Sequence, residues 1–441
     1  MDGLPAGVAA DPVSVPAAVD SATLVLVASS SAQEGGPVPV RVHLAAEESA
    51  LAERVSMVSL LIAGSPGSVD RSFGTDGRVP LLSGVGELEL ADVAVAADGS
   101  ITTMGQRLGE APEYARTAFL VRLTADGERD ASFGDGGLVY DNPSAYETTA
   151  RSLILVDGEA RALMMKRDDE DHVAGIQFLA GWDDDGALDS GFASRGVVQA
   201  LGYDSGYDSP RGLVFGDGRY FYGSFSALYA FDPAGAHEAI SVPDGYLAGL
   251  AMVHQNGRIT SGQSGPDAAV GRIHDDGRWD TEFGDGGVLR VDSIAADPDG
   301  VVGIAIALED DGSGFALVRH RGAELADVPE LIRFTADGRL DDSFGDGGRV
   351  RLADRGWPSD VFIDRQHRPV VRLRVATSEY RSESQLRRYT RSGTLDTTFG
   401  DGGMFVESPL LDAAGHDSVA DRVVTCGYAD YDRIACTRLW L

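Results

Sequence analysis

The sequence predicts an all-β fold: a seven-bladed β-propeller of four-stranded antiparallel blades, preceded by an incomplete β-sandwich segment. Three observations lead to this prediction. A Gly-x-x-Asp-x-x-Phe phrase recurs six times, most copies are about 60 residues apart, and Asp-Gly or Asn-Gly pairs divide alternating apolar segments. A fixed period indicates a repeat architecture, and four strands in a unit of about 40–60 residues are typical of propeller blades.

The repeated phrase usually continues into Gly-Asp-Gly-Gly. Such a corner suits tight turns, because glycine adopts positive φ at no steric cost. One longer interval contains a decayed copy near residues 231–235, which divides it into two shorter units. The Asp and Phe of the intact copies are Asp70 and Phe73, Asp130 and Phe133, Asp189 and Phe192, Asp280 and Phe283, Asp341 and Phe344, and Asp396 and Phe399.

Each unit has the same internal order. A short apolar strand such as 78–82 follows the corner, and an alternating segment such as 92–104 turns back at Asp98-Gly99. An Asp-Gly pair between alternating apolar segments is the strongest short-range signal of a β-hairpin. A fourth strand, such as 118–123, then leads into the next copy of the phrase.

Counting complete units after Phe73 predicts seven blades. The last unit contains a fourth strand of its own at 433–441, so we expect the ring to close with little contribution from the N-terminus. Eight blades would require residues 20–66 to supply another unit. The expected blades are 74–133, 134–192, 193–240, 241–283, 284–344, 345–399 and 400–441.

The spaced glycine, aspartate and phenylalanine resemble the delta-60 repeat, a bacterial β-propeller repeat, and the resemblance covers residues 66–441. It implies a propeller in a cell-envelope or secreted protein. It implies no defined reaction, so no catalytic residue is assigned from it.

Residues 1–65 have a different pattern. Short segments such as 23–27, 38–42 and 58–62 resemble the later strands of immunoglobulin-like (Ig-like) sandwich modules in bacterial surface proteins. The opening strands of such a module are absent, so we interpret the region as a partial module in an N-terminally truncated chain. A partial eighth blade is the alternative. The first residues lack the basic segment of a signal peptide, but the resemblance and the truncated start favour an extracellular or cell-envelope location.

The formal net charge is −32, from 37 basic and 69 acidic residues. Such a charge repels phosphate, which argues against nucleic acid and against anionic membrane surfaces as partners. No apolar segment approaches the length of about 18 residues that suggests a membrane span. We therefore expect a monomer without membrane insertion that engages protein or glycan partners.

The motif aspartates raise the question of a calcium ring. Calcium requires six to eight converging oxygens, whereas each repeat offers one or two carboxylates. We expect no cofactor, with Ca²⁺ as the alternative; each aspartate then caps its turn and each phenylalanine fills the gap between blades. An arginine five residues before the motif glycine is expected to bond a motif aspartate or a carbonyl. It recurs at Arg122, Arg272, Arg333 and Arg388, and Arg438 fits the same place in the last unit.

The third unit lacks this arginine and is rich in aromatic residues, whose faces stack on sugars and other flat ligands. The candidate ligand-binding residues are Tyr203, Tyr207, Tyr220, Tyr222 and Tyr229. The alternative is a shortened blade that compensates with larger core side chains.

Cys426 and Cys436 are predicted to lie on two strands around a turn at 429–432, where they can form a disulfide. A disulfide would favour an oxidising compartment. No metalloprotease-type histidine pair and no Gly-x-Ser-x-Gly sequence is present, so no catalytic or metal residue is assigned.

Two classes of function remain. The favoured one is a non-catalytic binding or scaffold module that engages protein or glycan; the alternative is a polysaccharide hydrolase or lyase with its site at the mouth of the channel. Recognition is expected in that channel or in the variable loops 105–116, 166–174 and 310–330.

Overall fold

A computed structural model shows an all-β chain. It describes residues 4–10, 26–28, 32, 35–44, 54–108, 116–141, 148–167, 175–204, 212–224, 227–240, 251–262, 264–265, 268–291, 301–320, 328–352, 356–378, 381–407, 411–430 and 433–441. In these ranges no helix is long and apolar enough to cross a membrane.

Seven sheets of four or five antiparallel strands follow one another in the described part of the chain, and we number them I to VII. In each, the chain runs from an inner strand outward through hairpins, and the alternating segments of the sequence form the first two or three strands. Sheets I to III are β6 (Leu88–Val95), β7 (Ile101–Leu108), β8 (Arg116–Leu123) and β9 (Leu138–Asp141); β10 (Thr148–Val156), β11 (Glu159–Arg167), β12 (Gly175–Trp182) and β13 (Val197–Asp204); and β14 (Leu213–Gly216), β15 (Arg219–Ser224), β16 (Ala227–Phe231) and β17 (His237–Ile240).

The later sheets repeat this order, with one short extra strand in sheet V and one strand from the N-terminal side in sheet VII. Sheets IV to VII are β18 (Met252–Gln255), β19 (Arg258–Gly262), β21 (Ala268–His274) and β22 (Val288–Arg290); β20 (Ser264–Gly265), β23 (Val301–Leu308), β24 (Gly314–His320), β25 (Val328–Phe334) and β26 (Arg349–Arg351); β27 (Gly356–Ile363), β28 (Pro369–Ser378), β29 (Arg381–Arg388) and β30 (Met404–Glu407); and β31 (Leu411–Asp417), β32 (Arg422–Asp430), β33 (Arg433–Trp440) and β5 (Arg78–Ser83).

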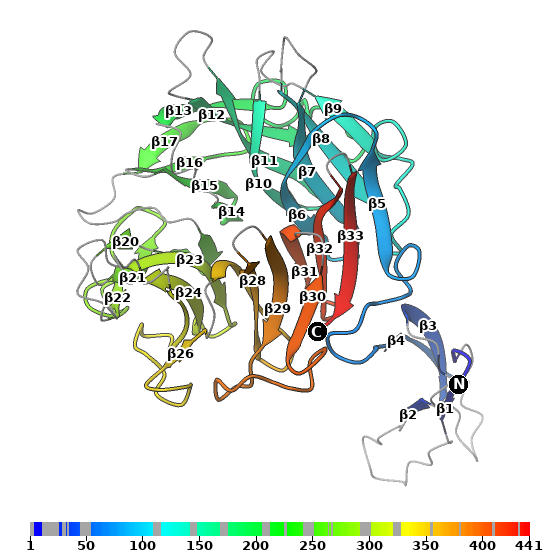
Figure 1. Ribbon diagram of the computed structural model, residues 1–441. Coiled ribbons are helices and arrows are strands. Elements are labelled where there is room, and N and C mark those ends of the chain that lie inside the picture. The colour runs from blue at the N-terminus through cyan, green and yellow to red at the C-terminus, as the bar shows by residue number, and fades with distance from the viewer. Residues whose placement is uncertain are drawn as a thin grey trace.

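The sheets are arranged radially around a common centre (Figure 1). The hydrophobic core is correspondingly divided into seven clusters within the described residues, and each cluster lies between two successive sheets. One cluster, for example, packs Val424 and Cys426 of sheet VII against Leu88 and Phe119 of sheet I. Each sheet therefore buries both of its faces against neighbours, which explains why its strands are apolar on both sides.

The ring closes through strand β5, contrary to the expectation that the last unit completes itself. The strand expected to be the fourth, β33, is the third strand of sheet VII, and β5 pairs with it as the outer strand (Figure 1). The register places Cys436 opposite Val79 and Ile434 opposite Leu82. Chain segments from the two ends of the propeller therefore share one sheet.

The expected blade boundaries require the same correction. The strand that follows each corner was assigned to the blade that comes after it, but it pairs with the strand before the corner, as β9 pairs with β8. Each sheet thus combines three strands of one sequence unit with the first strand of the next. The corner is itself the connection between the third and fourth strands of a sheet. Sequence periodicity alone therefore does not decide whether the strand after a corner belongs to the preceding blade or to the following one.

A disulfide joins Cys426 of β32 to Cys436 of β33. The two residues are directly opposite in the register, and both are fully buried in the cluster between sheets VII and I.

The N-terminal strands lie apart from the ring (Figure 1). Strand β1 (Val8–Ala10) pairs with β2 (Leu26–Ala28), and β3 (Gly35–Leu44) pairs with β4 (Arg54–Ile62). Within the described residues these two-stranded sheets do not join any sheet of the ring. They add no strand to the ring, so they do not form the eighth blade that was considered.

The two ends of the ring differ in their connections. The turn after each inner strand and the corner after each third strand lie at the same end, because the strands are antiparallel. Two of the loops expected to carry recognition, residues 109–115 and 168–174, are outside the described residues. The segment 310–330 is not an insertion, since Gly314–His320 is strand β24, and residues 310–313 belong to the turn after inner strand β23, at the same end as the corners.

Candidate functional site

Each intact corner uses its aspartate to hold its own turn. In the corner of sheet I, Oδ1 of Asp130 accepts the Ser132 amide and hydroxyl at 3.0 and 2.6 Å, and the Phe133 amide donates to the Asp130 carbonyl. The hydrogen bond from the Ser132 hydroxyl lowers the pKa of Asp130. The same amide contact occurs at Asp70, Asp189, Asp280, Asp341 and Asp396.

The recurring arginine binds the same aspartate. Nε of Arg122 lies 2.7 Å from Oδ2 of Asp130, and its guanidinium carbon lies 4.5 Å from the centre of the Phe133 ring. Such a charge-assisted bond combined with a cation–π contact fixes the guanidinium on both sides. The other motif pairs are Arg272 with Asp280 at 2.8 Å, Arg333 with Asp341 at 3.0 Å, Arg388 with Asp396 at 2.9 Å and Arg438 with Asp70 at 2.8 Å.

Sheet II also lacks the arginine, because Gly181 occupies that position, and Arg161 takes its place from the neighbouring strand. Arg161 lies opposite Gly181 in the register, and its Nη2 is 2.8 Å from Oδ2 of Asp189. Its guanidinium carbon lies 4.9 Å from the centre of the Phe192 ring. A side chain at Gly181 would collide with Phe192 and Arg161, at 2.9 and 3.0 Å from a Cβ atom. The glycine therefore makes room for the substitute arginine.

The corners also bond to one another around the ring. The amide that follows each motif phenylalanine donates to a carbonyl in the corner of the next sheet. The six bonds in the described residues run from Gly74 to Asp126, Gly134 to Asp185, Ala193 to Pro233, Gly284 to Asp337, Gly345 to Ser392 and Gly400 to Pro66. Arg122 reinforces the link from Gly134 to Asp185, because its Nη2 donates to the neighbouring Asp184 carbonyl at 2.7 Å.

These contacts assign the motif residues to the architecture. The six motif phenylalanines are buried in clusters between successive sheets. The motif aspartates lie in six separate corners, each bonded to an arginine there. Their carboxylates thus face cations of the protein instead of converging on a common point.

Two of the five tyrosines proposed as ligand-binding residues, Tyr220 and Tyr222, are buried in the hydrophobic core between sheets II and III. Tyr220 and Tyr222 are 2% and 1% exposed, so their ring faces cannot meet a ligand, and this corrects the expectation. Tyr220 approaches Nε of Arg161 at 3.3 Å, and burial raises the pKa of its hydroxyl. Tyr229 stacks on Tyr222 with ring centres 4.9 Å apart. The side chain of Tyr203 and the whole of Tyr207 fall outside the described residues.

A cavity of about 950 Å³ occupies the centre of the ring. Residues from all seven sheets, or directly before their inner strands, line it, and this volume is within the usual range of ligand sites. Small and aliphatic side chains such as Ala91, Leu213 and Ile306 form part of the wall. The polar lining residues are Glu89, Asp92, Gln106, Arg151, Arg319, Ser359, Asp360, Arg372 and Tyr428.

The inner strands carry β-bulges beside this cavity. Each of β6, β10, β23, β27 and β31 has one extra residue relative to its partner strand, four or five residues before the strand ends. A bulge leaves its residue out of the ladder and redirects it, and bulges are common next to functional sites. Three of these residues, Ala91, Arg151 and Ser359, line the channel. Three of the five irregular positions of the inner strands therefore line the channel.

The carboxylates of the channel are engaged within the protein. Glu89 contacts Gln106 and lies 3.5 Å from Arg116, whereas Asp360 contacts Arg372. The Asp92 carboxylate accepts the amides of Val93 and Leu153, each at 2.8 Å. Together with Arg151 and Arg319 they form a wall of fixed donors and acceptors.

Sequence reasoning missed this channel as a set of residues. Its lining comes from positions more than 300 residues apart, from Glu89 to Tyr428, and no local motif links them. The signal available in the sequence was weak: a charged residue, Arg151, close to the apolar segment 153–156 of an inner strand.

A comparison with protein families supports the architecture. A family profile described as "Domain of unknown function (DUF5122) beta-propeller" matches residues 96–133. This region holds strands β7 and β8 and one complete copy of the Gly-x-x-Asp-x-x-Phe phrase. No curated protein matches the chain. The profile match and the radial sheets identify the chain as a β-propeller.

Several solved structures are similar in fold. The WD40 domain of Pan2 from Neurospora crassa is 10% identical and has a TM-score of 0.46, covering 79% of this chain and 89% of that one. A protein from Dyadobacter fermentans, described as of unknown function, is 12% identical with a TM-score of 0.41, over 83% and 98% of the two chains. A puromycin hydrolase is 17% identical with a TM-score of 0.37, over 67% and 44%.

Proposed function

We propose that this β-propeller is a binding module that holds a glycan in its central channel without transforming it. The observation that supports this most is the cavity of about 950 Å³, in which charged and amide side chains from several sheets face one space. Sugar hydroxyls both donate and accept hydrogen bonds, so they match a wall that offers arginine, amide and carboxylate groups together.

The engagement of the channel carboxylates favours binding over catalysis. A glycosidase of the usual type needs two carboxyl groups that flank the scissile bond, one as acid and one as base or nucleophile. Here Asp92 is tied by two backbone amides and Asp360 by Arg372. A carboxylate held in such bonds is positioned as a fixed hydrogen-bond acceptor, which suits the binding of a ligand.

The wider setting belongs to the same proposal. We infer a monomeric, seven-bladed propeller of the delta-60 type in an extracellular or cell-envelope protein, with a partial Ig-like module at its N-terminal side. The disulfide between Cys426 and Cys436 supports an oxidising compartment. The protein's negative charge supports partners other than nucleic acid. The proposed location would be overturned if fractionation of the native cells recovered the protein in the reducing cytosol.

The test is a glycan-array screen of the purified protein, followed by titration of each hit. We expect Arg151→Met and Arg319→Met to weaken binding roughly 10-fold or more, because each removes a charged hydrogen-bond donor from the channel wall. Arg278→Met is the matched control, since its side chain is 83% exposed in a corner. Hits that the channel variants bind unchanged would overturn the channel as the site.

The enzymatic alternative is decided in the same samples. Each bound polysaccharide is incubated with the protein, and shortened products are sought by chromatography. Product release that Asp360→Asn abolishes would replace the binding proposal by a hydrolase or lyase.

A further inference from the structure

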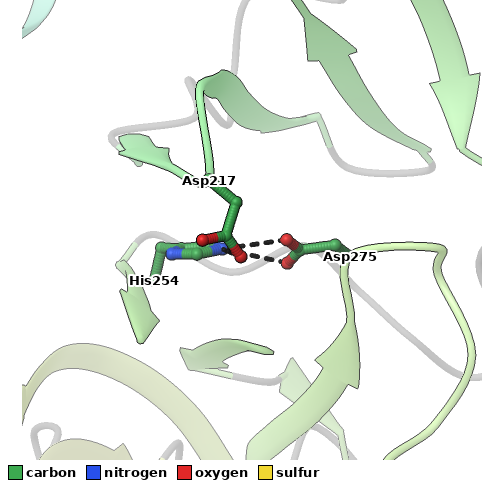
Figure 2. A group of neighbouring side chains, drawn as sticks. All are labelled: Asp217, His254 and Asp275. Carbon is green, nitrogen blue, oxygen red and sulfur yellow. Dashed lines mark hydrogen bonds and ion pairs between the residues drawn. The ribbon is translucent and has the colours of Figure 1, made fainter. Parts of the chain in front are cut away.

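His254, Asp217 and Asp275 converge at the junction of sheets III and IV, away from the glycan-binding proposal. Nε2 of His254 lies 3.0 and 3.1 Å from the two carboxylate oxygens of Asp275 and 3.9 Å from Oδ2 of Asp217. Figure 2 shows the Asp275 carboxylate directed at the edge of the imidazole ring, with the Asp217 side chain reaching the ring from sheet III. The three potential ligand atoms all lie within 4.8 Å of one another.

The imidazole ring of His254 is closely packed by its neighbours. Gly216 faces the ring so closely that a Cβ atom there would lie 1.8 Å from Nδ1 of His254. The Phe221 ring stacks on the imidazole with centres 5.5 Å apart and planes 10° apart. The His254 side chain is accordingly 5% exposed. With Nδ1 against Gly216, Nε2 is the nitrogen that points at the two carboxylates.

The three residues come from three different elements. Asp217 begins the turn after β14 in sheet III and has a φ of 48°, His254 lies on inner strand β18, and Asp275 begins the corner of sheet IV. Asp217 is 66% exposed and Asp275 is 23% exposed. One side of the cluster is therefore open to water, while the histidine side is closed.

The repeat does not require these residues. The positions that correspond to His254, two residues before the turn of sheets II and III, are Leu155 and Phe215. The residue two positions before the corner glycine, where Asp275 stands, is Ser65, Ala125, Asp184, Pro233, Ala336 or Arg391 in the other corners. His254 thus occupies a position that is apolar in sheets II and III, and the carboxylate of Asp275 faces it as an acceptor.

We propose that Asp217, His254 and Asp275 bind a divalent transition-metal ion of the zinc class. Zinc bonds of about 2.0–2.2 Å to nitrogen and oxygen place neighbouring tetrahedral ligands about 3.3–3.5 Å apart. The observed separations of 3.0 and 3.9 Å from Nε2 bracket this value, so small side-chain rotations suffice. One imidazole and two carboxylates complete three positions, and water completes the fourth on the exposed side.

The ion would join two sheets at the place where the repeat has decayed. Sheet III has a short turn at 232–236, between β16 and β17, in place of an intact corner. Among the described residues, the corner-to-corner amide bond occurs at the six other junctions. Asp217 belongs to sheet III, and His254 and Asp275 belong to sheet IV. A shared metal would link these neighbours across their junction.

The experiment titrates chelator-treated full-length protein with Zn²⁺ by calorimetry and follows thermal unfolding in parallel. We expect one site per chain and a higher melting temperature with zinc, because an ion that binds the folded state stabilises it. Asp217→Asn and Asp275→Asn should weaken binding about 100-fold or more, beyond the 10–100-fold that loss of a ligand's hydrogen-bond partner costs. Asn tolerates the positive φ at position 217.

His254→Leu copies the residue found at Leu155 and should abolish the site, while Asp184→Asn is the matched control because Asp184 holds the Asp275 position in sheet II. The exposed Asp217 variant keeps the test valid if His254→Leu fails to fold. The proposal is overturned if the wild type binds no stoichiometric zinc, or if its zinc affinity and melting shift persist in Asp217→Asn and Asp275→Asn. Glycan binding is unaffected in either case, so this result is independent of the channel proposal.

Discussion

At the scale of single residues, the corner motif is a set of charge-assisted bonds whose members can be exchanged. Arg161 shows this most clearly, because it reaches from β11 to the aspartate and phenylalanine that an arginine on the third strand contacts elsewhere. The geometry at Asp189 is retained although the sequence position of the cation has moved.

We predict that Arg161→Met lowers the free energy of unfolding by about 3 kcal/mol, because it leaves the Asp189 carboxylate without its cation in a largely buried site. The double variant Arg161→Met with Asp189→Asn should be more stable than the single one, since no uncompensated charge remains and Asn still accepts the Gly191 amide. Urea unfolding of the four proteins measures both. A double variant that loses the sum of the two single effects would show that the pair is uncoupled.

Individual residues also mark the limit of sequence reasoning. The roles of Asp130 and Phe133 follow from their recurrence, because six copies of one phrase demand one local cause. The aromatic residues of sheet III led to a wrong prediction, because a run of tyrosines has the same sequence pattern whether the rings face a ligand or fill a core. Tyr222 fills a core. The sequence did not indicate the cluster around His254, because its partner carboxylates lie 37 positions before and 21 positions after it in the chain.

At the scale of elements, strand β5 holds the ring together. Val79, Leu81 and Leu82 of this strand are buried between sheets VII and I, and β5 supplies the outer edge of sheet VII. Its corner contributes Asp70, which bonds both Arg422 and Arg438 at 3.2 and 2.8 Å. The strand thus combines an apolar contact with an ion-pair contact across the closure.

We predict that removal of residues 1–84 abolishes cooperative unfolding. It withdraws three buried aliphatic side chains worth about 1.5–3 kcal/mol each, together with the partner of two buried arginines, and this approaches the whole stability of a typical domain. Removal of residues 1–62 is the matched control, because it deletes strands β1 to β4 and leaves β5 and its corner intact. Its melting temperature should change by no more than about 4 °C. A cooperative transition in the longer deletion would show that sheet VII closes without β5.

The assignment of β5 also explains which part of the fold the sequence could predict. Strand number, hairpins and corners are local features of the sequence. Asp98-Gly99 indicates a hairpin, and Gly134 indicates a corner. The pairing of β5 with β33 joins residues more than 350 positions apart, and nothing near either strand records it. The unit of sequence repeat and the unit of structure therefore differ by one strand.

At the scale of the whole molecule, acid stability depends on many aspartates with the same type of shift. The pKa values of Asp130 and Asp341 are lowered by serine hydroxyls, and the pKa of Asp98 by Ser100. A carboxyl group whose folded-state pKa lies below its unfolded value binds fewer protons when folded. Stability then rises with pH through that range and is lost as pH falls below about 4. Asp421 opposes this, because burial raises its pKa.

One histidine adds a separate step at higher pH. His416 is packed near Phe362, with ring centres 5.8 Å apart, and burial lowers its pKa despite the nearby charges of Asp421, Asp417 and Asp364. The folded protein therefore binds fewer protons than the unfolded chain once pH falls below about 6.5, and stability declines by at most about 1.4 kcal/mol per pH unit.

We predict a two-step loss of stability on acidification, with a shallow decline from about pH 6.5 and a steep one below about pH 4. His416→Asn should remove the first step and leave the second, as measured by urea unfolding at half-unit intervals. The net charge of −32 offers a competing explanation, since relief of repulsion would raise stability on acidification. Salt separates the two: 0.5 M NaCl screens long-range repulsion but barely touches bonds of about 3 Å inside the corners, so both steps should persist. A rise in stability between pH 6.5 and 5 that salt removes would mean that repulsion, and not His416, dominates this range.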